Sequence, residues 1–419
     1  MPASPAAVFA LIFLAVLALD VGLRAWLALR QARFVARHRD RVPAEFADSI
    51  TLADHQKAAD YTAARLRVSL PALAVQTALL LLFTLGGLLD RLDLACSGLF
   101  DGRGYLYGLA LFAGVSVIGF AADLPFDLYR TFVVETRFGF NRTTPAVYAA
   151  DIVKQTLLAV VIGSPVLLAV LWLMSAMGTY WWFYVWLFWL GFNLLVLLLY
   201  PTLIAPLFNK FTPLPDGPVR SRIEALLARC SFTASGLFVM DGSRRSGHGN
   251  AYFTGLGHAK RIVFFDTLID KLQPGEVEAV LAHELGHFKR RHILKRIGVL
   301  AAATLALLWL LGQLIAAPWF YQGLGVQTGS TAMALALFTL ALPPFLFPLT
   351  PVTSWLSRRH EFEADAYAAE HAAAADLVHA LVTLYRDNAA TLTPDPLHSL
   401  FYDSHPPASL RIARLKGAS

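Results

Sequence analysis

Residues 155–209 have the sequence QTLLAVVIGSPVLLAVLWLMSAMGTYWWFYVWLFWLGFNLLVLLLYPTLIAPLFN, which contains no Asp, Glu, Lys or Arg. Residues 297–357 are also free of these four residue types. A helix that crosses a membrane needs about 20 apolar residues, so each stretch can hold two spans and a short connection. The whole chain of 419 residues is 57% hydrophobic and only 15% charged. Because about a quarter of the residues in soluble domains are charged, the composition predicts a mostly helical, polytopic membrane protein.

Seven apolar runs along the chain predict seven membrane-spanning helices. The first run has no basic segment before it and contains Asp20 and Arg24, so we expect a retained span and not a cleaved signal peptide. The predicted spans are Val8–Leu29, Val68–Leu89, Tyr105–Ala122, Leu157–Met177, Tyr180–Tyr200, Ile297–Ala317 and Ala332–Leu349. They divide the chain into residues 1–200 with five spans, a soluble insert at 201–296, two more spans in 297–357, and a soluble segment at 358–419.

Basic residues concentrate in alternate loops between the predicted spans. The loop after the first span has eight Arg or Lys residues, whereas the loop after the second has only Arg91 and Arg103. Cytoplasmic loops carry the excess of Lys and Arg, so we expect an outside N-terminus and a cytoplasmic insert and C-terminus. The net charge of +6 therefore reflects topology, and no single basic soluble domain suggests nucleic-acid binding. The chain ends in GAS without an endoplasmic-reticulum retrieval tail, so we expect a bacterial inner membrane.

The soluble insert combines short strands with helices. The alternating runs LFVM (residues 237–240), NAYF (250–253) and RIVFF (261–265) predict three strands. The last two would form a hairpin whose turn contains Gly255 and Gly257. Pro274 and Glu276 indicate the first turn of a helix that continues through AVLAHELGHFKRRH, residues 279–292.

The stretch AVLAHELGHFKRRH contains His-Glu-x-x-His, which is typical of a zinc site. On a helix the rings of His283 and His287 project from one face and can bind one ion. Glu284 lies beside that face, where its carboxylate can take a proton from zinc-activated water and pass it to a leaving nitrogen. A metzincin would have Gly and His where this chain has Arg290 and Ile293, so that class is excluded.

A catalytic zinc has three protein ligands and one open position, so a third ligand is needed. The segment SRRHEFEAD, after the seventh span, offers Glu361 as this ligand. Asp365, one helical turn later, would hold a ligand histidine through its ring N–H. His360 is a rival third ligand, and Glu363 is predicted to point elsewhere. His292 is predicted to be exposed at a helix end. The sequence thus predicts one zinc ion per chain.

Five motifs together resemble those of the integral-membrane zinc CaaX prenyl proteases, the seven-span type I enzymes. They are HELGH (residues 283–287), SRRHEFEAD (357–365), YRTFVVETRFGFNRTT (129–144), GNAYF (249–253) and SHPPASLRI (404–412). The resemblance covers most of the chain. It implies seven helices that enclose a large chamber, with a gluzincin-like zinc protease domain on the chamber wall near the cytoplasmic membrane face.

The resemblance also implies roles for individual residues in catalysis. His283, His287 and Glu361 would be the zinc ligands, and Glu284 would be the general base. His405 would stabilise the oxyanion of the tetrahedral intermediate. These assignments agree with the spacing argument for the two helical segments and add the C-terminal histidine to it.

Substrate recognition is implied by the same resemblance. Asn250, Ala251 and Tyr252 would form an edge strand whose backbone pairs with an extended peptide. Arg411 would either pair with a carboxylate of the zinc site or bind a substrate carboxylate. The implied activity is endoproteolysis near the C-terminus of a lipid-modified, CaaX-type peptide or of another membrane-associated peptide. Membrane lipids are further expected partners.

Other functions fit the sequence less well. A quality-control protease similar to HtpX would share the zinc motif and the later Glu, but such enzymes have fewer spans. A site-2-type intramembrane protease would place the motif inside a span, whereas Lys289, Arg290 and Arg291 follow it directly here. A non-catalytic, zinc-stabilised scaffold or conduit would not need Glu284. The sequence therefore favours a membrane zinc endopeptidase.

Overall fold

Seven helices among the described residues are long and apolar enough to cross a membrane, which confirms the predicted number. The chain is represented by a computed structural model that describes residues 4–100, 104–254 and 261–417. The seven helical segments are Pro5–Arg37, Leu52–Phe83, Tyr105–Phe138, Pro145–Ala176, Gly178–Phe208, His292–Leu314 and Thr331–His371. Large apolar side chains such as Leu11, Val117 and Val161 stay exposed along them, as expected where lipid replaces water.

Short π-helical and 3-10 stretches divide several of these segments into separate α-helices. The first five contain α1 (Pro5–Arg37), α2 (Leu52–Phe83), α4 (Tyr105–Tyr129), α5 (Thr136–Phe138), α6 (Pro145–Leu158), α7 (Ser164–Ala176), α8 (Trp181–Leu199) and α9 (Ala205–Phe208). The last two contain α13 (His292–Leu314), α15 (Thr331–Leu346) and α16 (Thr350–His371). The other helices are α3 (Leu88–Leu99), α10 (Pro218–Arg229), α11 (Asp266–Ile269), α12 (Pro274–Lys289), α14 (Pro318–Gly323), α17 (Ala374–Asp387), α18 (Pro396–Tyr402) and α19 (Ala408–Gly417).

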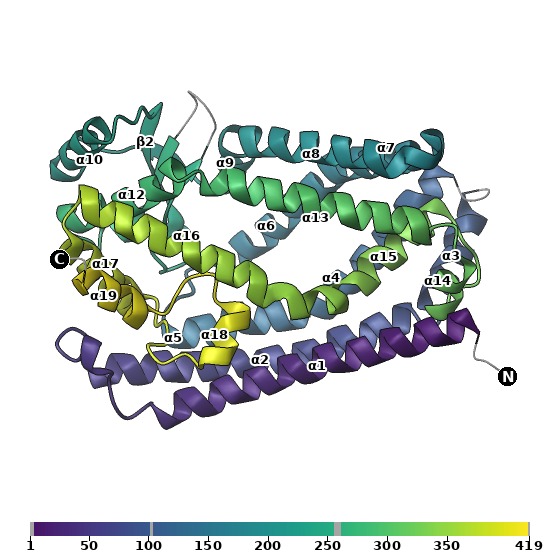
Figure 1. Cartoon of the computed structure of the whole chain (residues 1–419), viewed down its shortest axis with the longest axis horizontal. Coiled ribbons are helices and arrows are strands. Elements are labelled where there is room, and N and C mark those ends of the chain that lie inside the picture. The colour runs from purple at the N-terminus through teal and green to yellow at the C-terminus, as the bar shows by residue number, and fades with distance from the viewer. Residues whose placement is uncertain (1–3, 101–103, 255–260, 418–419) are drawn as a thin grey trace.

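The long helices lie side by side, and the soluble elements gather at one end of them (Figure 1). In this view α1 and α2 run along the lower side and α7 and α8 along the upper side. The end that holds α10, α12, α17 and α19 also holds the strands and the C-terminus. The insert and the C-terminal segment, which are separated by two spans in the sequence, therefore meet at one end of the molecule.

The second predicted span has the wrong ends. The prediction places it at Val68–Leu89, whereas α2 begins at Leu52 and ends at Phe83. The chain turns at Gly87, whose φ of 74° lies in the left-handed region that favours glycine. Leu89 already belongs to the next helix, α3. The apolar run continues through this turn, so hydropathy alone does not show the break.

The last span is longer than predicted, and its extension carries part of the candidate site. The prediction ends at Leu349, but after one 3-10 turn at Phe347–Leu349 the chain continues as α16 to His371. Prolines in the first turn of a helix do not interrupt it, because the N–H groups there have no intrahelical partner. Glu361 and Asp365 thus lie on a helix that continues directly from the seventh span.

The insert contains a small mixed sheet. Its strands are β1 (Phe211–Pro213), β2 (Gly236–Met240), β3 (Ala251–Thr254) and β4 (Arg261–Phe265), in the order β1-β2-β4-β3. Strands β2 and β4 are parallel, while β3 pairs antiparallel with β4. The three predicted strands are confirmed, whereas β1 is too short to show an alternating pattern. The predicted turn at Gly255 and Gly257 lies outside the described residues. Among the described strands, β3 has a neighbour on one side only.

Helix α12 is the centre of the soluble part. Its N-terminus has a capping box, in which the backbone N–H of Gln273 donates to Glu276 Oε2 at 2.9 Å. Val277, Leu281 and Leu285 are almost fully buried and belong to the apolar core shared with α10 and α17. The apolar positions that define this helix in the sequence therefore anchor the motif that it carries.

Two helices approach each other very closely at Gly286, inside the HELGH motif. A Cβ atom added at Gly286 would lie 2.9 Å from Ala364 Cα and 3.0 Å from the Ala364 carbonyl oxygen. Ala364 is fully buried on α16, between Glu361 and Asp365. The missing side chain at Gly286 thus allows α16 to pack against α12 with its two carboxylates beside the histidines.

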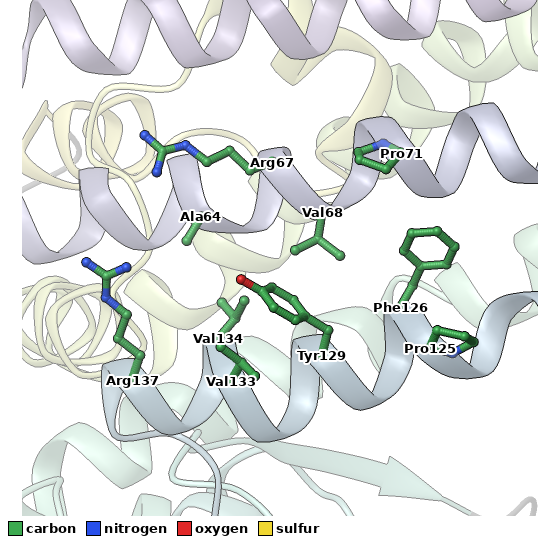
Figure 2. Close-up of a pocket in the computed structure, with 10 residues that line it drawn as sticks. All are labelled: Ala64, Arg67, Val68, Pro71, Pro125, Phe126, Tyr129, Val133, Val134 and Arg137. Carbon is green, nitrogen blue, oxygen red and sulfur yellow. The ribbon is translucent and has the colours of Figure 1, made fainter.

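A cavity of about 410 Å³ lies between α2 and the helical segment Tyr105–Phe138, which contains α4, a π-helical stretch at Arg130–Glu135 and α5 (Figure 2). Pro71 lies inside α2 and Pro125 inside α4, and both line the cavity. A proline inside a helix removes one backbone hydrogen bond and disturbs the turn before it. The two helices consequently leave space between them at this level.

We predict that Gly286→Ala destabilises the protein by about 1–3 kcal/mol, because the new methyl group overpacks the contact with Ala364. The measurement is thermal unfolding in detergent, together with the zinc content of the purified protein. Gly298→Ala on α13 is the matched control, since a Cβ there meets nothing within 4 Å. Equal melting temperatures for Gly286→Ala and wild type would contradict the importance of this close approach.

Candidate metal centre

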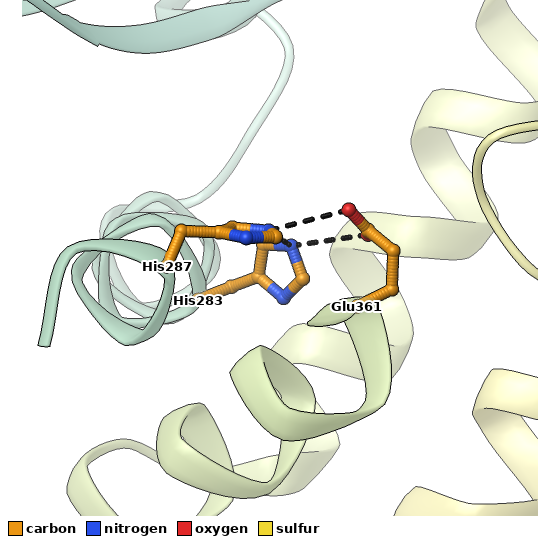
Figure 3. A group of neighbouring side chains, drawn as sticks. All are labelled: His283, His287 and Glu361. Carbon is orange, nitrogen blue, oxygen red and sulfur yellow. Dashed lines mark hydrogen bonds and ion pairs between the residues drawn. The ribbon is translucent and has the colours of Figure 1, made fainter. Parts of the chain in front are cut away.

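Helices α12 and α16 bring three side chains of the sequence-predicted zinc site together (Figure 3). His283 Nε2 and His287 Nε2 are 3.2 Å apart. Glu361 Oε2 lies 3.4 Å from His283 Nε2, and Glu361 Oε1 lies 3.3 Å from His287 Nε2. His283 and Glu361 are 6% and 4% exposed, so the group is almost closed to solvent on their side.

The spacing of these atoms fits a tetrahedral zinc ion. Ligand atoms at about 2.0–2.1 Å from a tetrahedral zinc lie about 3.3 Å from each other, which is close to the three distances observed here. Two imidazole nitrogens and one carboxylate oxygen are also ligand types that zinc prefers. Glu361 Oε2 is buried and accepts no hydrogen bond from the described residues. A buried acceptor of this kind is expected to have a partner, and a zinc ion would supply one.

The ring of His283 is held from its other side. Asp365 Oδ1 lies 2.8 Å from His283 Nδ1, so the carboxylate accepts the ring N–H and leaves Nε2 free for a metal. Arg411 binds the same carboxylate with two hydrogen bonds, from Nη2 to Oδ1 at 2.6 Å and from Nε to Oδ2 at 2.8 Å. Of the two roles expected for Arg411, the structure shows the pairing with a carboxylate of the site.

The ring of His287 is held in a similar way by His292, for which the sequence predicted an exposed position. His292 is 4% exposed, not at the surface as predicted, and its Nδ1 lies 3.0 Å from His287 Nδ1. Its Nε2 donates to Glu363 Oε2 at 3.0 Å, and Glu363 itself lies outside the metal group. His360 is outside the ligand group and stacks on His292 with ring centres 4.1 Å apart.

A turn that reverses the chain explains the error for His292. Arg291 has a φ of 57° and separates α12 from α13, so the chain folds back and His292 returns to the zinc-binding face. Helical periodicity carried past Lys289 cannot show this return. The only available signal in the sequence is a third histidine five positions after His287, and this spacing matches neither a helix face nor a known ligand motif.

The carboxylates of the site change the protonation of His283. Burial disfavours the charged ring, but the neighbouring carboxylates of Asp365 and Glu361 outweigh it and raise the pKa of His283 to about 9. Without metal this ring therefore carries a proton at neutral pH. Since a zinc ligand must be the neutral imidazole, metal binding has to displace that proton.

Two further residues were predicted to be catalytic. Glu284 follows His283 on α12, is half-buried and has no hydrogen-bond or ion-pair partner among the described residues. His405, in the loop between α18 and α19, places its Nε2 3.4 Å from Glu361 Oε1. With 61% of its side chain exposed, His405 can contact both this carboxylate and a molecule from outside.

The strand predicted to bind substrate lies next to the motif helix. Ala251 and Tyr252 belong to β3, the edge of the sheet, and β3 packs on α12. Asn250 caps the start of this strand, since its Oδ1 accepts the Ala251 N–H at 2.8 Å. Burial raises the pKa of Tyr252 to about 12, so its hydroxyl remains protonated at neutral pH. An edge strand beside a metal site is the arrangement in which a peptide backbone can be held for cleavage.

The segment at residues 129–144, YRTFVVETRFGFNRTT, contacts both the membrane helices and the insert. Tyr61 on α2 donates to Glu135 Oε1 at 2.6 Å. Further along the segment, Asn141 forms a β-bridge with Ser246, a few residues before β3. This motif therefore connects the spans to the edge strand and does not itself enter the metal group.

Fold and site together define a multi-pass membrane metallopeptidase. Comparison with known families agrees with this class. Residues 31–210 match the family model described as CAAX prenyl protease N-terminal, five membrane helices. Residues 213–419 match the model of peptidase family M48.

Individual relatives show similarity over most of the chain. The CAAX prenyl protease 1 homolog of Arabidopsis thaliana is 39% identical over 335 residues, which cover 79% of this chain and 77% of the plant protein. CAAX prenyl protease 1 of Saccharomyces cerevisiae is 36% identical and covers 73% of this chain, with 71% of its own length matched. The crystal structure of Ste24p from S. mikatae superposes with a TM-score of 0.91 at 31% identity, over 97% of this chain and 99% of that one.

The chain therefore belongs to the CAAX prenyl proteases of peptidase family M48, as the sequence motifs indicated. It is an integral membrane metalloendopeptidase with the seven-span architecture of this family.

We predict that Asp365→Asn lowers the zinc affinity by about 10–100-fold, because the ring of His283 loses the charged acceptor that orients it. The measurement is competition for zinc against a chromogenic chelator. Glu370→Gln, an exposed position on the same helix, is the control for loss of one negative charge. Unchanged affinity in Asp365→Asn, or an equal loss in the control, would contradict an orienting role for Asp365.

Proposed function

We propose that this protein is a zinc endopeptidase that cleaves near the C-terminus of lipid-modified, CaaX-type peptides at the membrane. The observation that carries the proposal is the group of His283, His287 and Glu361, whose spacing fits zinc. Glu284 follows His283 on the same helix, and its carboxylate has no partner among the described residues. The similarity to proteins named CAAX prenyl protease 1 supports the substrate class.

In this proposal His283, His287 and Glu361 hold one zinc ion. Bound zinc lowers the pKa of a water molecule to about 7 and polarises the scissile carbonyl. Glu284 accepts a proton from the attacking water and delivers it to the leaving amide nitrogen. Its lack of a protein partner suits this role, because no ion pair has to break when the carboxylate takes up the proton.

His405 acts on the developing negative charge. Its Nε2 lies next to Glu361 Oε1, at the exposed side of the metal group, where a substrate carbonyl would approach. A donor placed there stabilises the oxyanion of the tetrahedral intermediate more than it stabilises the planar peptide. His405 lies on a loop after α18, so the C-terminal segment supplies this group.

Strand β3 positions the substrate backbone. Asn250 comes directly before β3, and Ala251 and Tyr252 are its first two residues. Because β3 is an edge strand, an extended peptide would add to the sheet there as a further strand. Recognition through backbone hydrogen bonds depends little on side chains, so the lipid group and the membrane would provide the selection of substrates.

The location of the site follows from the distribution of charge. The distribution of Lys and Arg among the loops supports a cytoplasmic insert and a cytoplasmic segment at residues 358–419, so the zinc site would face the cytoplasm. A bacterial inner membrane remains a prediction from the sequence alone, and the relatives named above are eukaryotic. The match of residues 31–210 to the five-helix CAAX protease model favours this function over an HtpX-like protease.

We predict that Glu284→Gln keeps a full zinc content and loses activity by a factor of about 10²–10⁴, because only the proton acceptor is removed. The assay is cleavage of a prenylated CaaX peptide followed by mass spectrometry, with zinc measured on the same sample. His283→Ala is the comparison, since it should lose the metal as well as the activity. Hydrolysis by Glu284→Gln at the wild-type rate would refute the assigned base.

The substrate class is tested separately with paired peptides of one sequence, prenylated and unprenylated. We expect the enzyme to cleave the prenylated peptide faster, both in detergent and in lipid nanodiscs. After a chelator has removed the metal, we expect no cleavage in either preparation. Equal rates for the two peptides would leave a zinc endopeptidase but remove the CaaX-type assignment.

A further inference from the structure

We propose that the groove between α2 and α4 is a binding site for an anionic phospholipid of the surrounding membrane. The groove is the cavity of about 410 Å³ described above, and it lies outside the metal centre. Ten residues line it, from α2, from α4, from the π-helical stretch that follows and from α5: Ala64, Arg67, Val68, Pro71, Pro125, Phe126, Tyr129, Val133, Val134 and Arg137.

Charge and apolar surface are separated along this groove. Figure 2 shows Arg67 and Arg137 at one end, on opposite walls, and Pro71, Pro125 and Phe126 at the other end. The hydroxyl of Tyr129 points toward the arginine end. A molecule that matches this distribution has a negative group at one end and a hydrocarbon chain along the other. An anionic phospholipid has both.

The two arginines are available for such a group. Neither forms an ion pair or a side-chain hydrogen bond with another described residue, and both are exposed. The carboxylate of Asp60 interacts electrostatically with both, but it is already bound by Arg39 through two hydrogen bonds of 2.9 Å. Two guanidinium groups on facing walls can bind one phosphate between them, since each offers several N–H donors.

The groove faces away from the polar side of the two helices. At 3.6 residues per turn, Gln76 lies about 140° around α2 from Pro71, and Asp123 lies about 160° around α4 from Pro125. These two residues form a hydrogen bond of 3.0 Å with each other. Polar side chains within spans face the interior of a bundle, so the opposite faces, which form the groove, are directed toward lipid.

The face of α2 that continues from the groove is apolar and exposed. Val75 and Leu82, within about 40° of Pro71 around the helix, are 38% and 49% exposed. Arg67 is the last charged residue on α2 before this apolar part. The arginines thus lie at the membrane surface and the apolar end of the groove lies deeper, which is the orientation of a phospholipid in a bilayer.

A lipid in this groove would contact the segment that supports the insert. Val133, Val134 and Arg137 belong to the segment that contains Glu135, the acceptor for Tyr61 on α2. The lipid would therefore connect α2 with α4 at the level where the membrane helices contact the protease insert.

The test uses the full-length protein in detergent micelles with dioleoyl phosphatidylglycerol, and native mass spectrometry counts the lipids that remain bound. We expect one retained lipid per wild-type chain and about tenfold weaker retention in Arg67→Gln/Arg137→Gln, because basic residues at the surface attract anionic headgroups. Arg33→Gln/Arg37→Gln, which removes two exposed arginines near the end of α1, is the matched control and should behave as wild type.

Three comparisons decide the chemistry of the occupant. Dioleoyl phosphatidylcholine should not replace the anionic lipid, and inorganic phosphate at millimolar concentration should not displace it. Equal retention by wild type and Arg67→Gln/Arg137→Gln, or equal binding of phosphatidylcholine, would overturn the proposal. Displacement by phosphate alone would show a site for a free anion, and displacement by a prenylated peptide would show a substrate site; both would also overturn it. Unchanged zinc content verifies that the variants are folded.

Discussion

The close contact between α12 and α16 at Gly286 and Ala364 is the constraint on which the functional part of this structure depends. One helix carries the two histidines, and the other carries the carboxylate that completes the group. Any side chain larger than hydrogen at Gly286 would reach the backbone of the facing helix. Because ligand atoms about 3.3 Å apart are required around zinc, even a small separation of the helices would open the site. The packing of two backbones therefore decides the metal geometry.

Each ligand histidine is oriented by a chain of hydrogen bonds from outside the metal group. Asp365 holds His283 and is itself held by Arg411, while Glu363 holds His292, which contacts His287. These partners come from α16, α19 and the start of α13, so three separate segments support two rings. The buried arrangement leaves the histidine Nε2 atoms directed at one point. Such support lowers the cost of ordering the site when metal binds.

The membrane helices and the catalytic part are joined by continuous structure. The seventh span continues through one 3-10 turn into α16, and the sixth begins directly after the turn that follows α12. The zinc centre is consequently fixed at the membrane surface by the ends of two spans. The fold thus joins the metallopeptidase part to the membrane helices without a flexible linker between them.

The sequence by itself determined the number of spans, the strands of the insert and the family, and it named His283, His287 and Glu361, which the fold brings together. These features depend on local periodicity, on composition and on short motifs, which can be recognised without knowledge of tertiary contacts. The sequence misplaced the ends of the second span and the position of His292. Only the tertiary structure decided these, because a left-handed turn at Arg291 and a glycine contact between helices bring together residues that are distant or out of phase in the chain. The tertiary structure also showed which of its two expected partners Arg411 has. Its guanidinium group donates two hydrogen bonds to Asp365, because the fold buries that carboxylate beside it.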